Sequence, residues 1–120
     1  MAAKDDLGRA GEERAARYLT AAGYDILDRN WRCPQGELDI VALGGRVLVF
    51  VEVKTRRSMA YGHPLEAVDV RKRRRLWKLA HAWMAQHPDM AHGRSLRVDV
   101  IGITGADPFS ATLEHLVDVV

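Results

Sequence analysis

Three carboxylates and one lysine lie in two segments of the chain that otherwise have the composition of buried β-strands. Glu37 and Asp39 belong to the first segment, and Glu52 and Lys54 belong to the second. Charged side chains are rarely buried without a partner, because removing an isolated charge from water is costly. Carboxylate oxygens are the ligands that Mg²⁺ and Mn²⁺ prefer. The pattern therefore predicts that one of these divalent cations binds between the two segments.

The alternation of side chains along a strand predicts which residues share a face. In the first segment one face is expected to carry Glu37, Asp39, Val41 and Leu43, and the other Leu38, Ile40 and Ala42. In the second segment one face is expected to carry Leu48, Phe50, Glu52 and Lys54, with valines on the reverse. Gly44-Gly45 separates the segments and is typical of a hairpin turn. Such a hairpin would bring Asp39 and Glu52 to the same end of the sheet.

A helix before these strands supplies a fourth carboxylate. Residues 5–22 are rich in helix-forming residues, and Gly23 is the kind of residue that ends a helix. At about 100° per residue, Glu12 falls on the stripe that faces the core. Glu13 points to solvent, at the spacing that favours a pair with Arg17. The alternative for Glu12 is that it only complements the helix dipole near the first turns.

Lys54 shares its expected face with Glu52, and two roles are open for it. In a metal site its ammonium group could orient or deprotonate a metal-bound water and stabilise a pentacoordinate phosphorus centre. In a purely structural arrangement Glu52 and Lys54 would pair at a sheet edge, and Asp39 would bind a nearby arginine.

The other elements complete one domain. We expect a strand at 24–31, a helix that begins at Leu65 or after an Asp69 N-cap and ends near Gln86, and strands at 97–103 and 112–119. No linker interrupts this order, so residues 1–120 are predicted to form a single α/β domain with a small mixed sheet.

The composition limits the possible disulfides, metal sites and cellular compartment of the protein. A chain of 120 residues can bury one core without disulfides. Its single cysteine, Cys33, excludes an intrachain disulfide and a cysteine-rich zinc site, and favours a reducing compartment. The sequence has neither an apolar run that could span a bilayer nor the hydrophobic core of a signal peptide, so we expect a cytoplasmic protein without a membrane partner.

Basic residues are clustered although the net charge is only +2. Arg56 and Arg57 follow the second carboxylate segment, and Lys72 lies in a run of five basic residues, 71–75. Such clusters attract phosphate backbones. We therefore expect Arg56, Arg57 and Lys72 to contact nucleic acid; the alternative is a solvated helix face. The tryptophans are expected in the core or an interface rather than as base-stacking platforms: Trp31, Trp77 and Trp83.

The motifs Gly-Glu-Leu-Asp-Ile-Val-Ala at 36–42 and Val-Phe-Val-Glu-Val-Lys-Thr-Arg at 49–56 resemble a known family. This is the YraN-like family of small bacterial endonuclease-like proteins, which is similar to the archaeal Holliday-junction resolvases of the PD-(D/E)XK, or restriction-endonuclease-like, superfamily. The acidic motif alone would be weak. The resemblance extends over nearly the whole chain, through Gly8-x-x-Gly11-Glu12, Arg29-Asn30-Trp31 and Arg97-Val98-Asp99-Val100.

The resemblance implies a restriction-endonuclease-like fold with an αβββαβ core and a role for each matching residue. Asp39 takes the first acidic position, although Leu38 replaces the proline of the motif. Glu52 takes the second acidic position, and Lys54 the lysine position. Val53 lies between them and could offer its carbonyl to the metal.

Two further carboxylates follow from the same resemblance. Glu12 matches the helix glutamate of the resolvase-like branch and would complete the metal shell. Glu37 belongs to the family signature and not to the general superfamily motif, so it is a candidate for the second shell or a second metal.

The resulting expectation is a Mg²⁺- or Mn²⁺-dependent endonuclease that hydrolyses phosphodiester bonds in DNA, with structured or branched DNA as the suggested substrate. A homodimer is a further expectation, because the related resolvases are dimers. Two alternatives remain open. One is a nucleic-acid-binding module that keeps the fold without cleaving. The other is a protein-interaction domain that uses the second helix and the apolar tail around Leu116 and Val117.

Overall fold

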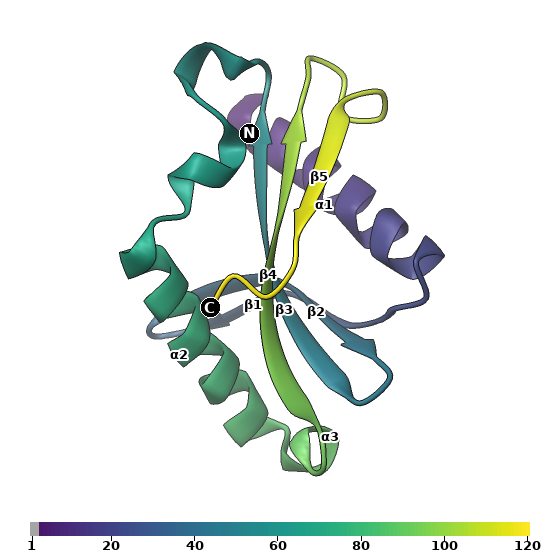
Figure 1. The fold of residues 1–120 in the computed structure, drawn as a ribbon, viewed down its shortest axis with the longest axis vertical. Helices are drawn as coiled ribbons and strands as arrows, with labels where there is room; N and C mark the ends of the chain where they lie inside the picture. Colours follow the sequence, from purple (N-terminus) through teal and green to yellow (C-terminus); the bar gives the residue numbers. More distant parts are fainter. Residues whose placement is uncertain (1–2) are drawn as a thin grey trace.

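The computed structural model describes residues 3–120, which form a five-stranded mixed sheet with helices on both of its faces (Figure 1). The elements in chain order are α1 (Ala3–Ala21), β1 (Asp25–Cys33), β2 (Gly36–Gly44), β3 (Val47–Arg56), two short 3-10 helices (Met59–Tyr61 and Pro64–Ala67), α2 (Val70–Gln86), α3 (Pro88–Ala91), β4 (Ser95–Thr104) and β5 (Thr112–Leu116). The strands lie side by side in chain order. Only β3 and β4 are parallel, and α2 lies in the connection between them. The predicted α/β class is confirmed, and the arrangement is compatible with a small restriction-endonuclease-like fold.

Two hydrophobic cores sandwich the central strand β3. Its residues Leu48 and Phe50 pack against α2, whereas Val49 and Val51 pack against α1. The alternation predicted for this strand is therefore confirmed. The helices contribute apolar stripes to the two cores: Ala15, Ala16 and Leu19 from α1, and Leu76, Leu79, Ala80 and Trp83 from α2. Figure 1 shows the two helices on opposite sides of the sheet.

The alternation predicted for β2 is wrong at one point. Leu38 packs in the core on the α2 side, whereas Ile40 packs in the core on the α1 side. The pairing of β2 with β3 ends at Ile40 and Val51, and the residues of β2 before Ile40 separate from β3. Without that ladder the strand rotates, so the alternation shifts by one residue beside Asp39.

The helix ends follow the capping residues. Gly23 has a φ of +99°, and its N–H donates to the carbonyl of Thr20, which ends α1 as predicted. Asp69 is the N-cap of α2 and accepts the Lys72 N–H at 3.0 Å. The alternative start of this helix at Leu65 is therefore wrong, because Pro64–Ala67 forms a separate 3-10 helix.

Two smaller differences concern the connections. The turn between β2 and β3 is formed by Gly45 and Arg46, because Gly44 still pairs with Val47. The short helix α3 was not expected from the sequence. Among the described residues, no helix has the length and apolar character that would let it cross a membrane.

The close packing of α1 on β3 depends on Gly11. A Cβ atom at this position would lie 2.2 Å from Thr55 Oγ1. We therefore expect Gly11→Ala to lower the free energy of unfolding by about 1–3 kcal/mol through overpacking, although alanine is the better helix former. Gly8→Ala is the matched control: nothing lies within 4 Å of its new Cβ. It should raise stability by about 0.5–1 kcal/mol. Urea denaturation compares the two, and an equal gain for both variants would contradict the packing argument.

Candidate active site

The site is built at the point where β2 separates from β3. Beyond the last ladder pair, the Asp39 carboxylate replaces the missing strand partner: its Oδ2 accepts the Val53 N–H at 2.8 Å. The prediction that Asp39 and Glu52 lie at the same end of the sheet is supported by a side-chain hydrogen bond between them. Asp39 thus occupies the gap between the two strands, where it can interact with groups on either face of the sheet.

Three carboxylates from α1 and β2 converge on the α1 side of this gap. Glu12, Glu37 and Asp39 each offer one oxygen, and these oxygens all lie within 4.8 Å of one another. All three residues are partly exposed. Two oxygens bound to one Mg²⁺ at about 2.1 Å are about 3–4 Å apart. The donor set therefore fits a hard divalent cation after small side-chain movements.

Burial and the neighbouring carboxylates raise the pKa of Glu12. Burial is the main cause, followed by the nearby charge of Asp39, and together they bring the pKa to about 7. A side-chain hydrogen bond from Asn30 acts in the opposite direction. The helix-face prediction for Glu12 agrees with this position, because the side chain faces Asp39.

Glu52 reaches the same point from the other face of the sheet. It is not a member of the three-oxygen group found among the described residues, and it interacts with Asp39 instead. Burial, the hydrogen bond with Asp39 and the charge of Asp39 raise the pKa of Glu52 to about 9. The charges of Lys54 and Lys72 act in the opposite direction. Two carboxyl groups that share one site favour a proton between them in the absence of a cation.

The raised pKa of Glu52 can be tested on the metal-free protein. Because the pKa of Glu52 is raised from its ordinary 4.5 to about 9 in the folded protein, the free energy of unfolding falls as the pH rises from about 4.5 toward about 9. We expect Glu52→Gln to be about 1–3 kcal/mol more stable than the wild type near pH 8.5 in EDTA, and to show little gain near pH 5. Urea unfolding at the two pH values checks this. A stability difference that does not change with pH would contradict it.

Of the basic residues predicted to contact nucleic acid, only Lys72 has a described interaction with the site. Lys72 lies in the first turn of α2, and its charge acts on Glu52. Arg56 ends β3, where its carbonyl accepts the Gly105 N–H at 2.9 Å, and Arg57 is exposed in the loop that follows. No described contact joins Arg56 or Arg57 to the carboxylates, so their role stays a prediction. The same holds for a metal contact by the Val53 carbonyl.

Asn30 is a residue of the site to which the sequence reasoning assigned no role. It has a φ of +54° and forms a side-chain hydrogen bond with Glu12. Asparagine tolerates this left-handed conformation better than most residues. The available signal was an asparagine just before the end of the strand expected at 24–31, because asparagine is uncommon in strands.

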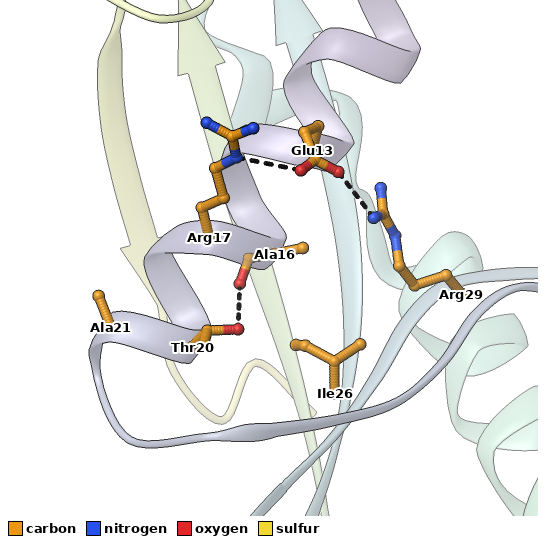
Figure 2. Close-up of a pocket in the computed structure, with 7 residues that line it drawn as sticks. All are labelled: Glu13, Ala16, Arg17, Thr20, Ala21, Ile26 and Arg29. Atoms are coloured by element: carbon orange, nitrogen blue, oxygen red, sulfur yellow. Dashed lines mark hydrogen bonds and ion pairs between the residues drawn. The ribbon is translucent and has the colours of Figure 1, made fainter.

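Beside the carboxylates, α1 and β1 enclose a separate hollow of about 530 Å³. Figure 2 shows Arg17 and Arg29 reaching Glu13 from opposite sides, at 3.0 and 2.8 Å. The predicted Glu13–Arg17 pair is confirmed. Glu13 also binds Arg29, whose charge acts on Glu12 as well.

A second group of charges forms around Asp99, on β4. Its carboxylate is fully buried and accepts hydrogen bonds from Arg97 at 2.9 and 2.8 Å. His115 Nε2 lies 2.7 Å from the same carboxylate, and the Asp118 N–H donates to it at 2.9 Å. The predicted Arg97–Asp99 pair is confirmed. The group holds β5 and the segment after it against β4.

The fold and the cluster define an α/β protein whose sheet presents carboxylates and a lysine at the point where two strands diverge. The chain matches the model of the Uncharacterised protein family UPF0102 over residues 11–103. It is 52% identical to a UPF0102 protein of Beutenbergia cavernae over 116 residues, 97% of each chain. It is also 54% identical to a UPF0102 protein of an Arthrobacter species over 116 residues, again 97% of each. A UPF0102 protein of Leifsonia xyli subsp. xyli matches over the full length of both chains at 46% identity. The chain therefore belongs to the UPF0102, or YraN, family, which confirms the resemblance seen in its motifs.

Proposed function

We propose that this protein is a Mg²⁺- or Mn²⁺-dependent endonuclease that hydrolyses phosphodiester bonds in DNA, with structured or branched DNA as the preferred form. One observation carries the proposal. The oxygens of Glu12, Glu37 and Asp39 lie within 4.8 Å of one another, and Glu52 is hydrogen-bonded to Asp39 beside Lys54. The protein itself compensates one of these carboxylates, since Arg32 Nε lies 2.9 Å from Glu37 Oε2. The close approach of the others is unfavourable in the folded protein unless a cation or protons neutralise them.

The residues divide the work of hydrolysis between them. Glu12, Glu37 and Asp39 would hold the cation, and Glu52 would join them or fix the orientation of Asp39. When bound, the cation would supply Lewis-acid stabilisation of the phosphate charge and a more acidic water. Lys54 would orient the attacking water and offset negative charge on the phosphorus oxygens. As the water oxygen bonds to phosphorus, the P–O ester bond breaks, which leaves a phosphate monoester and a hydroxyl group.

The sequence shows no helix of the kind that reads base edges, so we expect cleavage to depend on the form of the DNA more than on its sequence. The basic residues that the sequence singled out, Arg56, Arg57 and Lys72, would guide the phosphate backbone.

The test incubates purified protein with supercoiled DNA and with a four-way DNA junction, in Mn²⁺ and in EDTA. We expect Mn²⁺-dependent cleavage that disappears in EDTA and falls about a hundredfold in Lys54→Ala. Asp89→Asn is the matched control, because Asp89 is an exposed aspartate on α3 and its charge acts on neither Glu12 nor Glu52; this variant should cleave like the wild type. Cleavage that persists unchanged in Lys54→Ala would contradict the proposal. DNA binding without cleavage of either DNA would favour the alternative of a non-cleaving module.

A further inference from the structure

The outer side of α2 carries basic side chains and no acidic one. The helix Val70–Gln86 contains neither aspartate nor glutamate. Its inner positions are buried against the sheet, whereas four basic residues are exposed on the outside and are called here the basic face of α2: Arg71, Arg74, Arg75 and Lys78. At 3.6 residues per turn these positions fall on one side of the helix.

The basic face differs from the basic residues of α1 in forming no ion pairs, although the charge of Arg71 acts on the N-cap carboxylate of Asp69. On α1, Arg17 is paired with Glu13 at 3.0 Å and Arg9 with Asp6. Within residues 3–120, no residue of the basic face forms an ion pair. Like charges one turn apart weaken a helix, and basic residues near its N-terminus oppose its dipole. The stability of the fold therefore does not account for this face, whereas an anionic partner does.

An aromatic side chain lies along the edge of the basic face. Trp77 is 39% exposed, in contrast to Trp83, which is 2% exposed in the core. Trp77 is therefore not a core residue, and the other expectation for it, a place in an interface, stays a prediction. Its ring meets His81 edge-on, with centroids 4.9 Å apart, and it lies one turn from Arg74. The His81 contact holds the indole in place while part of the ring stays accessible. An exposed aromatic ring beside cationic groups is the arrangement with which proteins stack unpaired bases.

The helix also leads to the candidate active site. Lys72, in its first turn, lies close enough for its charge to act on Glu52. A nucleic-acid strand bound along the basic face toward the N-terminal end of α2 would therefore approach the carboxylates.

We propose that the basic face of α2 and Trp77 together bind a single-stranded segment of DNA, with the phosphates on the basic residues and an unpaired base stacked on the indole. The preferred substrate is then DNA in which a duplex adjoins an unpaired strand. The inference about the preferred substrate rests on the proposed nuclease function. The inference that this surface binds single-stranded DNA does not.

The test measures binding in EDTA, by fluorescence anisotropy, to an oligothymidylate strand, a blunt duplex, and the same duplex with a thymidine flap. We expect Trp77→Ala to weaken binding to the strand and the flap by about tenfold or more, and binding to the duplex by less than about twofold. Trp77→Phe keeps an aromatic face and should retain most of the affinity. An equal loss on all three DNAs, or no loss on any, would overturn the stacking role.

The salt dependence tests the basic face separately. Arg74→Ala and Lys78→Ala should weaken binding to every DNA and reduce the slope of log affinity against log salt by about one each. Arg46→Ala is the matched control, because Arg46 is an exposed arginine on the turn between β2 and β3, and its slope should equal that of the wild type. Unchanged slopes in the α2 variants would overturn the assignment of this face.

The two proposals can fail independently. If Trp77 governs strand binding but Asp39→Asn cleaves DNA as well as the wild type, the binding surface stands and the nuclease assignment fails. If cleavage requires Asp39 but Trp77→Ala binds and cleaves flapped DNA normally, the nuclease assignment stands and the surface fails.

Discussion

Asp39→Asn is expected to lower Mn²⁺-dependent DNA cleavage by about a thousandfold, the largest effect of any single substitution on activity. Asp39 contacts the residues on both sides of the site. It belongs to the three-oxygen group with Glu12 and Glu37, it is hydrogen-bonded to Glu52, and its Oδ2 accepts the Val53 N–H. An amide oxygen can still accept that N–H but brings no negative charge to a cation. The measurement is the single-turnover rate on junction DNA at saturating protein.

The interpretation requires that the variant be folded. Asp39→Asn should have the circular dichroism spectrum of the wild type and bind DNA in EDTA with similar affinity. We also expect it to be no less stable than the wild type in EDTA, because the substitution removes one charge from a crowded cluster. A folded Asp39→Asn protein that cleaves within threefold of the wild-type rate would contradict the proposed site.

Asp99→Ala is expected to have the largest effect on stability, a loss of about 3–5 kcal/mol in the free energy of unfolding. Burial alone would raise the pKa of Asp99, but hydrogen bonds from His115 and Arg97 outweigh it, and the pKa is lowered from its ordinary 3.8. Removing the carboxylate leaves Arg97 without its counter-ion and the Asp118 N–H without its acceptor. Urea denaturation near pH 7 measures the loss.

The same prediction has a pH component. Because the folded-state pKa of Asp99 is lowered, its contribution is present above about pH 4 and is lost as the pH falls further. The gap between the wild type and Asp99→Ala should therefore narrow in acid. Asp89→Asn changes an exposed aspartate on α3 and should stay within about 0.5 kcal/mol of the wild type. A loss below about 1 kcal/mol for Asp99→Ala would show that the buried group contributes little.

The regular elements could be predicted because their signals are local. The 3.6-residue period placed Glu12 on the inner side of α1, and strict alternation placed Glu52 on the α2 side of β3. Asp69 and Gly23 marked helix ends through their own backbone and side-chain chemistry. These inferences need no knowledge of how distant segments pack.

The details of the site could not be predicted in this way, because they arise from tertiary packing. Leu38 and Ile40 lie on opposite faces only because β2 leaves β3 beside Asp39, which no local pattern records. For the same reason Glu37 was expected only to support the metal ligands or to bind a second metal, whereas the structure puts its carboxylate next to Glu12. The closeness of Lys72 to Glu52 likewise depends on where α2 docks on the sheet.

The proposed nuclease function requires that the carboxylate cluster bind a cation. Three oxygens from α1 and β2 lie together, and the raised pKa values of Glu12 and Glu52 show that the metal-free cluster favours protons. A divalent cation would replace those protons. Cation affinity should then increase as the pH rises, because each bound proton competes with the metal.

Crystals soaked in Mn²⁺ test this claim most directly through the anomalous signal of the metal. We expect a peak among Glu12, Glu37 and Asp39, at about 2.0–2.3 Å from their oxygens, and its disappearance in Asp39→Asn crystals soaked in the same way. A well-ordered wild-type crystal with no peak at these three residues, or with an equal peak in Asp39→Asn, would contradict it.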